Sequence, residues 1–443
     1  MTVSLGGTYG ETAKTARAPR ALQDFFTRRP NLAASHLYAF LWTTARRGGL
    51  ITRYDFDQLH DRKNTSSIKY DAASLLGKKE GLLPLWVADM DFPTAQPVID
   101  ALVERARNGI FGYEFASPAY FAAVQGWMFD HFGWETDWKW IVRTPGVVAA
   151  LATAVRAFTK PGDAVLVQPP VYYPFFSDVT QNGRTLVTSP LVYEDGRYRM
   201  DFDDFERTVA DNGVKLFLLC NPHNPVGRAW TRGELERVAE ICGRHGVIVA
   251  SDEIHEDFAR PGHEHVVYAS VSESAARSCI VCTAPSKTFN LAGLQTSNVF
   301  IPNPTLRKRF KAEYRSGGLD EANAFGLAAA QAAYEHGAEW LEELKGYLEG
   351  NLAFVREFLD TRLPMLKLVE PESTYLLWID CSALGLNDDG LQQLIEDEAG
   401  LWLDMGTMFG EEGSGFVRVN IACPRSTLEQ AFAALARALP SQK

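Results

Sequence analysis

Short apolar runs alternate with amphipathic stretches through the middle of the chain. Four runs of about four residues each are wholly apolar and predict buried strands; they cover residues 164–167, 216–219, 247–250 and 279–282. Between the second and third runs, Thr231 and Glu234 form a capping box that opens a helix reaching about His245. An amphipathic pattern from Val98 to Arg107, stopped by Asn108-Gly109, predicts another helix. Alternating strands and helices predict an α/β fold with a mostly parallel sheet.

The pattern changes in the last third of the chain. A long helical stretch is predicted from about Glu321 to Asp360. Strands are then predicted at Tyr375 to Ile379 and at Phe416 to Asn420, followed by a closing helix from Ser426 to Leu439. These elements indicate a second, smaller α+β domain.

A chain of 443 residues is expected to form two domains. We predict a large domain over residues 97–331, with residues 53–96 and 332–443 forming the small domain. Residues 1–52 are rich in arginine, in contrast to the acidic remainder, and are predicted to be a leader outside the core. A transit peptide is one interpretation of this leader. A non-native leader or an upstream-extended start is the interpretation we favour.

Composition narrows the classes of partner. A formal net charge of -11 argues against a nucleic-acid partner, and the sequence has no apolar stretch long enough to span a membrane. Six scattered cysteines suggest reduced core thiols of a cytoplasmic protein. Cys279 and Cys282 have a C-x-x-C spacing, but in a strand they would face opposite sides, which disfavours a zinc or redox site. The segment from His263 to His265 suggests a metal ligand set, although a polar loop is the favoured interpretation without a partner cluster.

Chemistry is concentrated where the predicted strands end. Lys287 follows the run at 279–282, Asp252 follows the run at 247–250, and Asn224 follows the run at 216–219. A single lysine at a strand end is usually a solvated surface residue. However, a desolvated lysine that can react with an aldehyde, together with an aspartate for a ring nitrogen, is the pair that a pyridoxal phosphate (PLP) site requires.

Three motifs carry a family resemblance from about Tyr54 to the C-terminus. They are the segments 85–92 (LWVADMDF), 222–227 (PHNPVG) and 286–294 (SKTFNLAGL). This pattern resembles the fold-type I PLP enzymes of the class I/II aminotransferase superfamily, and within them the cystathionine β-lyase (C-S lyase) branch. The resemblance implies the PLP-dependent transferase fold with a mostly parallel seven-stranded sheet, a PLP cofactor and a homodimer with shared active sites.

The resemblance assigns cofactor-binding roles to specific residues. Lys287 would bind the aldehyde, Asp252 the ring nitrogen and Asn224 the phenolic oxygen. Tyr172 would stack on the ring, the alternative being a proline-flanked surface turn. His255 would be either a direct contact or a buried neighbour of the site.

The phosphate is expected at a glycine-containing turn before a helix. The backbone N-H groups of Gly146, Val147 and Val148 would bind it, with the Ser286 hydroxyl. Such turns are common, so this signal alone is weak. Gln295 stands where related enzymes often carry a basic residue.

Substrate contacts are predicted at three positions. Arg418 lies within an apolar run, where a charge needs a partner; a substrate carboxylate is the favoured one and an internal salt bridge is the alternative. Arg425 is a weaker second candidate. Tyr113 resembles the residue donated from the partner subunit, with a catalytic or substrate-binding role.

The resemblance implies α,β-elimination of cystathionine or a related cysteine S-conjugate to thiol, pyruvate and ammonia. An aminotransferase would use the same residues, so that alternative stays open. A regulatory protein that retains lyase activity is a third possibility. The exact thioether substrate cannot be predicted from the sequence.

Overall fold

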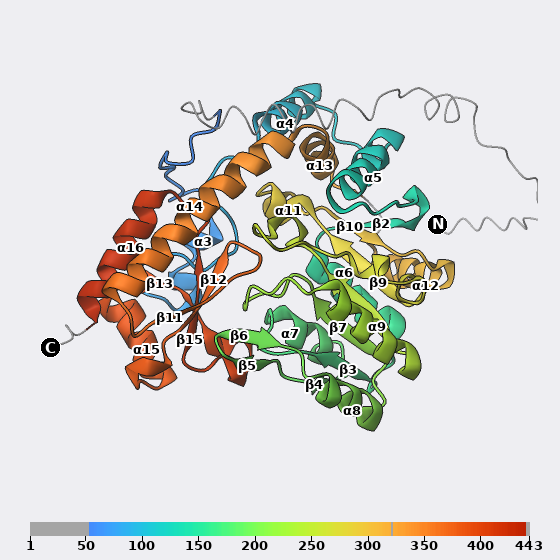
Figure 1. Cartoon of the computed structure of the whole chain (residues 1–443). Helices are drawn as coiled ribbons and strands as arrows, with labels where there is room; N and C mark the ends of the chain where they lie inside the picture. Colours follow the sequence, from blue (N-terminus) through green and yellow to red (C-terminus); the bar gives the residue numbers. More distant parts are fainter. Residues whose placement is uncertain (1–52, 320–321, 440–443) are drawn as a thin grey trace, which may run out of the picture. The chain divides into compact units, whose positions relative to one another are not determined.

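The computed structural model describes residues 53–319 and 322–439 of the chain (Figure 1). The predicted leader at 1–52 lies outside the described residues. The boundary of the compact unit that carries the fold falls between Arg53 and Tyr54. Within the described part of the chain, no helix is both long and apolar enough to cross a membrane.

The central element is a seven-stranded sheet with the strand order β2-β10-β9-β8-β7-β3-β4. Its strands are β2 (Ile141–Thr144), β3 (Ala164–Val167), β4 (Thr185–Thr188), β7 (Leu216–Cys220), β8 (Ile248–Asp252), β9 (Cys279–Thr283) and β10 (Ser297–Phe300). All neighbouring pairs from β9 to β4 are parallel, and only β10 runs antiparallel to its two neighbours. The prediction of a mostly parallel seven-stranded sheet is therefore confirmed.

Helices cover both faces of this sheet, which explains why its interior strands β3 and β7 are apolar at every position. Along β9, Cys279 and Val281 belong to one core, whereas Ile280 and Cys282 belong to the other. The two cysteines therefore face opposite sides, as predicted, and all six cysteines of the chain are unpaired. One face is covered by α6 (Val147–Phe158), α7 (Pro174–Thr180) and α12 (Pro304–Ser316), and the other by α5 (Pro118–Phe132), α8 (Phe202–Asn212), α9 (Arg232–His245) and α13 (Ala324–His336).

The capping signals in the sequence mark real helix ends. Thr231 and Glu234 form the predicted capping box at the start of α9. Helix α4 (Gln96–Asn108) ends at Gly109, which adopts the left-handed conformation with φ 72°. Further elements of the described chain are α3 (Ile68–Asp71), α10 (Glu273–Arg277), α11 (Pro285–Thr288), α15 (Asp388–Gln393), β5 (Val192–Glu194) and β6 (Arg197–Arg199).

The helical stretch predicted from about Glu321 to Asp360 consists of two helices, with a break that the sequence analysis did not predict. Helix α13 ends at His336 and α14 (Ala338–Arg362) begins after Gly337. A Cβ atom at position 337 would lie 2.4 Å from a ring carbon of Phe289. The chain therefore changes direction at a residue that must lack a side chain.

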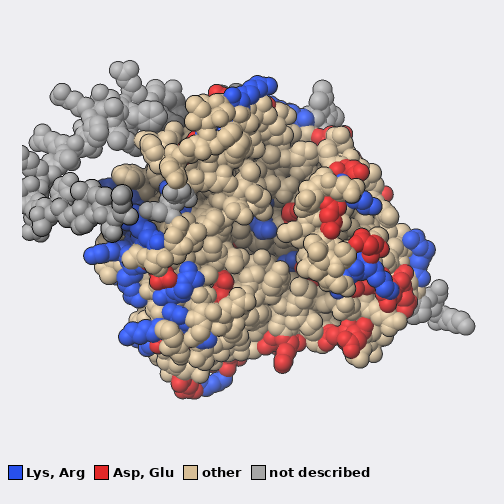
Figure 2. Space-filling model, turned by 180° about the vertical axis from the view of Figure 1, so that it is seen from behind, with Lys and Arg blue, Asp and Glu red and all other residues tan. Residues whose placement is uncertain are grey.

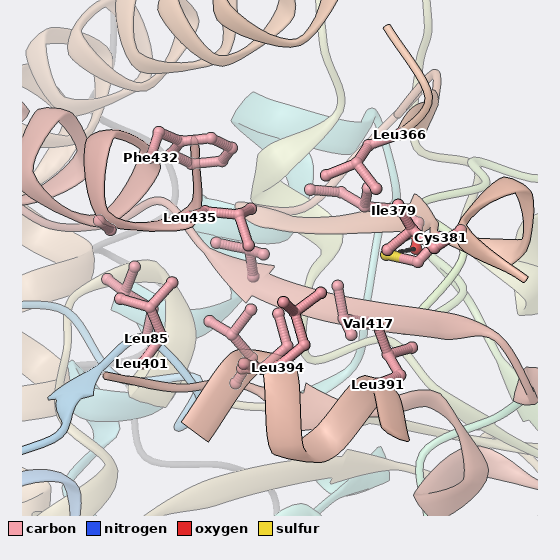
Figure 3. Close-up of a pocket in the computed structure, with 15 residues that line it drawn as sticks. Leu85, Leu366, Ile379, Cys381, Leu391, Leu394, Leu401, Val417, Phe432 and Leu435 are labelled. Atoms are coloured by element: carbon pink, nitrogen blue, oxygen red, sulfur yellow. Dashed lines mark hydrogen bonds between the residues drawn. The ribbon is translucent and has the colours of Figure 1, made fainter. Parts of the chain in front are cut away.

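A smaller antiparallel sheet of order β11-β12-β15-β14 follows. It contains β11 (Lys367–Val369), β12 (Leu376–Asp380), β14 (Asp404–Met405) and β15 (Phe416–Asn420), and α16 (Arg425–Ala438) closes the chain. Strand β1 (Leu83–Pro84) pairs in parallel with β13 (Leu401–Trp402), which joins the segment before α4 to the C-terminal part. Figure 3 shows the apolar core here, where Ile379 and Val417 of the sheet face Leu394 and Phe432.

Candidate active site

The carboxyl ends of three neighbouring parallel strands bring the predicted residues together. Register places Cys220 of β7 beside Asp252 of β8, and Asp252 beside Cys282 of β9. Lys287 lies in the short helix α11 directly after β9. This edge is where open α/β sheets bind ligands. Figure 2 shows a hollow on the rear face of the molecule with basic atoms inside it.

Lys287 has the properties of a reactive amine. Its Nζ donates a hydrogen bond of 2.7 Å to the carbonyl oxygen of Ala88. Burial and the nearby Arg418 guanidinium lower the lysine pKa to about 8, although Asp89 and Asp252 oppose this shift. A larger fraction of this amine is therefore neutral near pH 8 than for an ordinary lysine, and the neutral amine is the nucleophilic form.

Asp252 is a buried carboxylate with few partners. Its Oδ1 accepts a 3.1 Å hydrogen bond from the backbone N-H of Ile254, and no described residue forms a salt bridge with it. Burial raises the pKa of this carboxyl to about 7, against the opposing effects of that hydrogen bond and of Lys287. A cationic ring N-H from a ligand would supply the missing partner.

The predicted phosphate seat lies at the start of α6. Gly146 precedes this helix without a capping side chain, so the N-H groups of Val147 and Val148 have no side-chain acceptor there. Ser286 is buried next to Lys287 in the chain. Gln295, the residue in place of a basic one, lines a cavity of about 190 Å³ together with Arg143.

Asn224 and Tyr172 are tied to each other through the backbone. The N-H of Tyr172 donates to the carbonyl of Asn224 at 3.1 Å. Burial raises the pKa of the Tyr172 phenol. The charge of Arg418 opposes this shift and that of Asp252 adds to it, so the Tyr172 ring lies close enough to both residues to be affected by their charges. The Asn224 side chain is buried.

His255 is buried beside a residue that the sequence analysis did not single out. Its Nδ1 has no hydrogen-bond partner in the described chain, and burial lowers the histidine pKa well below its usual value. The ring lies edge-on to Tyr375 with centroids 5.8 Å apart. The Tyr375 hydroxyl donates to Ala88 O at 3.0 Å, the same acceptor that Lys287 uses.

Arg418 lies in β15 with its guanidinium buried among several partners. Nη1 donates to Asn224 Oδ1 at 2.9 Å and Nη2 to Trp86 O at 3.0 Å. Nη2 also forms a buried ion pair with Asp404. The internal salt bridge that the sequence left open is therefore present, while the Arg418 Nε is buried without a partner among the described residues.

The sequence analysis missed Asp404, although a signal existed. Asp404 is a single charge in the otherwise apolar run from Leu401 to Met405, just as Arg418 is in its own run. The two face each other in the register of β14 and β15. That register cannot be read from a single sequence.

The other two predicted substrate-binding residues, Arg425 and Tyr113, have their described contacts elsewhere in the chain. Arg425 begins α16, where its Nε donates to Asn351 Oδ1 at 2.9 Å and its guanidinium covers the Phe354 ring. Tyr113 lies in the connection between α4 and α5 and is 89% exposed. Both substrate roles remain predictions.

The segment from Trp86 to Phe92 is held in place by a partly buried ion-pair network. Arg62 pairs with Asp89 at 2.6 Å and with Asp91 at 2.7 Å. The fully buried Lys69 pairs with Asp91 at 2.8 Å. These contacts fix the carbonyls of Trp86 and Ala88, which the Arg418 guanidinium and the Lys287 amine contact.

These residues fit PLP. Asp252 has an unmatched buried carboxylate for the ring nitrogen, Lys287 offers a neutral amine to the aldehyde, and the start of α6 offers N-H groups to a phosphate. The unpartnered Nε of Arg418 offers a further donor to a carboxylate.

Comparison with known proteins agrees with this fit. The model of the family "Aminotransferase class I and II" matches residues 81–435. Cystathionine beta-lyase PatB of Bacillus subtilis is 45% identical over 87% of this chain and 100% of its own length.

Two solved structures that contain PLP are also similar. Cystalysin from Treponema denticola has a TM-score of 0.84 and 36% identity, covering 87% of this chain and 98% of its own. A C-S lyase from Staphylococcus hominis has a TM-score of 0.83 and 32% identity, covering 88% and 100% of the two chains. The chain thus belongs to the aminotransferase class I and II family of PLP-dependent enzymes.

Proposed function

We propose that this protein is a PLP-dependent C-S lyase that cleaves cystathionine or a related cysteine S-conjugate. The products are a thiol, pyruvate and ammonia. The strongest single observation is that Lys287 and the buried Asp252 lie at neighbouring strand ends, with pKa values shifted to about 8 and about 7. The 45% identity with a cystathionine beta-lyase over its whole length supports the lyase branch.

Residues of this chain account for binding and proton transfer. Arg418 binds the substrate carboxylate, which supplies the acceptor that its Nε lacks. With its amine free, Lys287 would remove the proton from Cα of the bound substrate. The electron pair of that bond becomes the Cα-Cβ double bond as the Cβ-S bond breaks, and the thiolate leaves with the sulfur electrons. Water then hydrolyses the remaining enamine to pyruvate and ammonia.

When bound, PLP supplies an electron sink for the charge that develops at Cα. Asp252 keeps the ring nitrogen protonated through its carboxylate. Asn224 would donate to the phenolic oxygen and Tyr172 would cover the ring face. The N-H groups of Gly146, Val147 and Val148 would hold the phosphate with the Ser286 hydroxyl, and His255 packs against Tyr375 near the site.

The Arg418-Asp404 ion pair adds a condition to substrate binding. The substrate carboxylate must share the guanidinium with a buried carboxylate that is already paired to it. Asp404 partly offsets the charge of the guanidinium, and Nη1 is already bonded to Asn224. We expect binding to be moderate in strength and selective for the geometry of an amino-acid carboxylate.

We also propose a cytoplasmic homodimer with active sites shared between subunits. Tyr113 would reach the partner's phosphate, and the exposed neighbours Ile110, Phe111 and Phe115 would be covered by the partner. Mixing Tyr113→Ala with Lys287→Ala subunits under exchange should restore activity in some heterodimers. No recovery from two inactive parents would place each site within one chain. If cystathionine is the substrate, the homocysteine produced would supply methionine biosynthesis.

The family description keeps an aminotransferase as the second candidate. Both reactions begin with the same proton abstraction, and they diverge at the next step, where only the lyase breaks the Cβ-S bond. A regulatory protein retaining lyase activity is compatible with the same site.

One product analysis separates the candidates. Purified holoenzyme is incubated with cystathionine without any 2-oxo acid, and thiol and pyruvate are measured together, with Lys287→Ala as the control. Equal release of thiol and pyruvate by the wild type supports the lyase. Turnover that needs a 2-oxo acid and releases no thiol would leave the aminotransferase.

A further inference from the structure

A group of buried acids lies in the segment that directly follows β8. Glu253, Glu256 and Asp257 are all less than 7% exposed. Asp257 is fully partnered, because it accepts from Trp127 Nε1 at 3.1 Å and from Thr288 Oγ1 at 2.5 Å. Glu256 needs a separate explanation, since a buried charge is costly unless it is paired or binds a metal.

Glu253 contacts the histidine that the sequence analysis noticed. The Nε2 of His265 lies 2.9 Å from Glu253 Oε2. Glu253 Oε1 accepts from Ser251 Oγ at 2.7 Å and from the Tyr268 N-H at 2.9 Å. The side chains of Glu253 and His265 are both almost fully buried. Their relative position is therefore fixed by the surrounding backbone and side chains.

Glu256 lies next to this pair without a partner of its own. It is 2% exposed, its Oε2 has no hydrogen-bond partner among the described residues, and neither does Nδ1 of His265. One ligand atom each from Glu253, Glu256 and His265 lies within 4.8 Å of the others. The loop containing His263 and His265 thus acquires in the fold the carboxylate partners that its sequence alone lacked.

We propose that Glu253, Glu256 and His265 form a binding site for a divalent transition-metal ion, with Zn²⁺ as the best match. One imidazole and two carboxylates are ligands that Zn²⁺ accepts at about 2.0 to 2.2 Å. Tetrahedral ligands at that range lie about 3.4 Å apart, so the three atoms need only small side-chain shifts. A mixed nitrogen and oxygen set favours Zn²⁺ over Mg²⁺, which prefers oxygen ligands and retained water.

An adjoining cavity provides the entry path and the fourth ligand. Glu256 and His265 line a pocket of about 410 Å³ that also contains His263 and Glu264. A water molecule from this pocket can complete a four-coordinate site. The ion would offset the two buried carboxylates and tie the loop at 263–265 to the segment that directly follows Asp252.

Equilibrium dialysis of the holoenzyme against Zn²⁺ tests the site, with bound metal measured by mass spectrometry. We expect one Zn²⁺ per wild-type chain and a thermal midpoint that rises with the Zn²⁺ concentration. Glu256→Gln and His265→Gln should weaken binding more than about ten-fold. Glu264→Gln, the same change at an exposed neighbour, should bind as the wild type does. Dialysis against Mg²⁺ should leave no stoichiometric metal.

Two outcomes would overturn the proposal. One is a wild type that holds no stoichiometric Zn²⁺, which would mean that Glu256 is simply a protonated acid. The other is unchanged binding in both ligand variants. If a variant fails to fold, the visible absorption spectrum of Co²⁺ bound to the wild type is the deciding measurement. We expect the bands of a tetrahedral site with nitrogen and oxygen ligands, and the absence of these bands would count against the proposal. None of these measurements depends on the reaction catalysed.

Discussion

The apolar core of the small sheet and the strand-end site of the large sheet are both buried, but for opposite reasons. In the core of Figure 3, Ile379 and Val417 are about 1 to 2% exposed and meet other aliphatic side chains. At the strand ends, Asp252 is 5% exposed and Lys287 is half-buried, with few partners. Burial in the first region lowers the free energy of the folded chain. In the second region, burial raises the pKa of Asp252 to about 7 and lowers that of Lys287 to about 8. Burying these two charged groups makes the folded chain less stable.

The largest effect should come from Lys287→Ala. Lyase turnover is expected to fall by roughly 10³-fold or more, because both the covalent partner of the cofactor and the general base are lost. Thermal stability of the cofactor-free protein should stay equal or rise, since a desolvated amine is removed. Activity measurements test the expected loss of turnover, and thermal unfolding tests the expected stability. A clear loss of stability would show that Lys287 also has a structural role.

Asp252→Asn should give the next largest loss. We expect turnover to fall by roughly 10²-fold, because the ring nitrogen is no longer held protonated, while the variant still binds PLP. Rates measured alongside the cofactor absorbance test this expectation. Wild-type rates in a variant with bound PLP would remove Asp252 from the mechanism.

Ile379→Ala should reverse the pattern seen at the strand ends. Removing a buried aliphatic side chain is expected to lower the free energy of unfolding by about 2 to 5 kcal/mol. Turnover per folded molecule should change little, because Ile379 lies in the core and not at the strand ends. Denaturant unfolding and active-site titration give the two numbers, and a selective loss of turnover would mean that the core controls the site.

Arg418→Lys is expected to have the smallest effect of the series. The charge is kept but the bidentate geometry is lost, so KM should rise by roughly ten-fold while kcat changes less. Steady-state kinetics with cystathionine provide the test. The matched change Arg425→Lys, at a guanidinium bound to α14, separates the two predicted substrate arginines. A larger rise in KM for Arg425→Lys than for Arg418→Lys would indicate that Arg425, not Arg418, binds the substrate carboxylate.

Much of the fold could be predicted because local patterns and tertiary packing agree. The strand at 164–167 was predicted with its observed ends, since every one of its positions is apolar. The prediction of 247–250 ended two residues short of β8, because Ser251 and Asp252 are polar yet still paired in the sheet. The break at Gly337 was missed because helical periodicity continues on both sides and the cause is the distant Phe289 ring.

The candidate site could be predicted only where a charged residue stands next to an apolar run, a position at which packing alone would favour an apolar residue. Lys287 and Asp252 are identifiable as charged residues directly after apolar runs. Asp404 required the pairing of two strands, and the partner of His265 required a chain reversal that returns it to Glu253. A single sequence contains neither of these contacts.

Borohydride reduction of the purified, yellow holoenzyme, followed by peptide mapping, tests the central claim most directly. The claim is that Lys287, the half-buried lysine after β9, carries the cofactor. We predict a single labelled peptide with the label on Lys287. A label on any other lysine, or no stable label on a fully loaded protein, would contradict the assignment and the mechanism built on it.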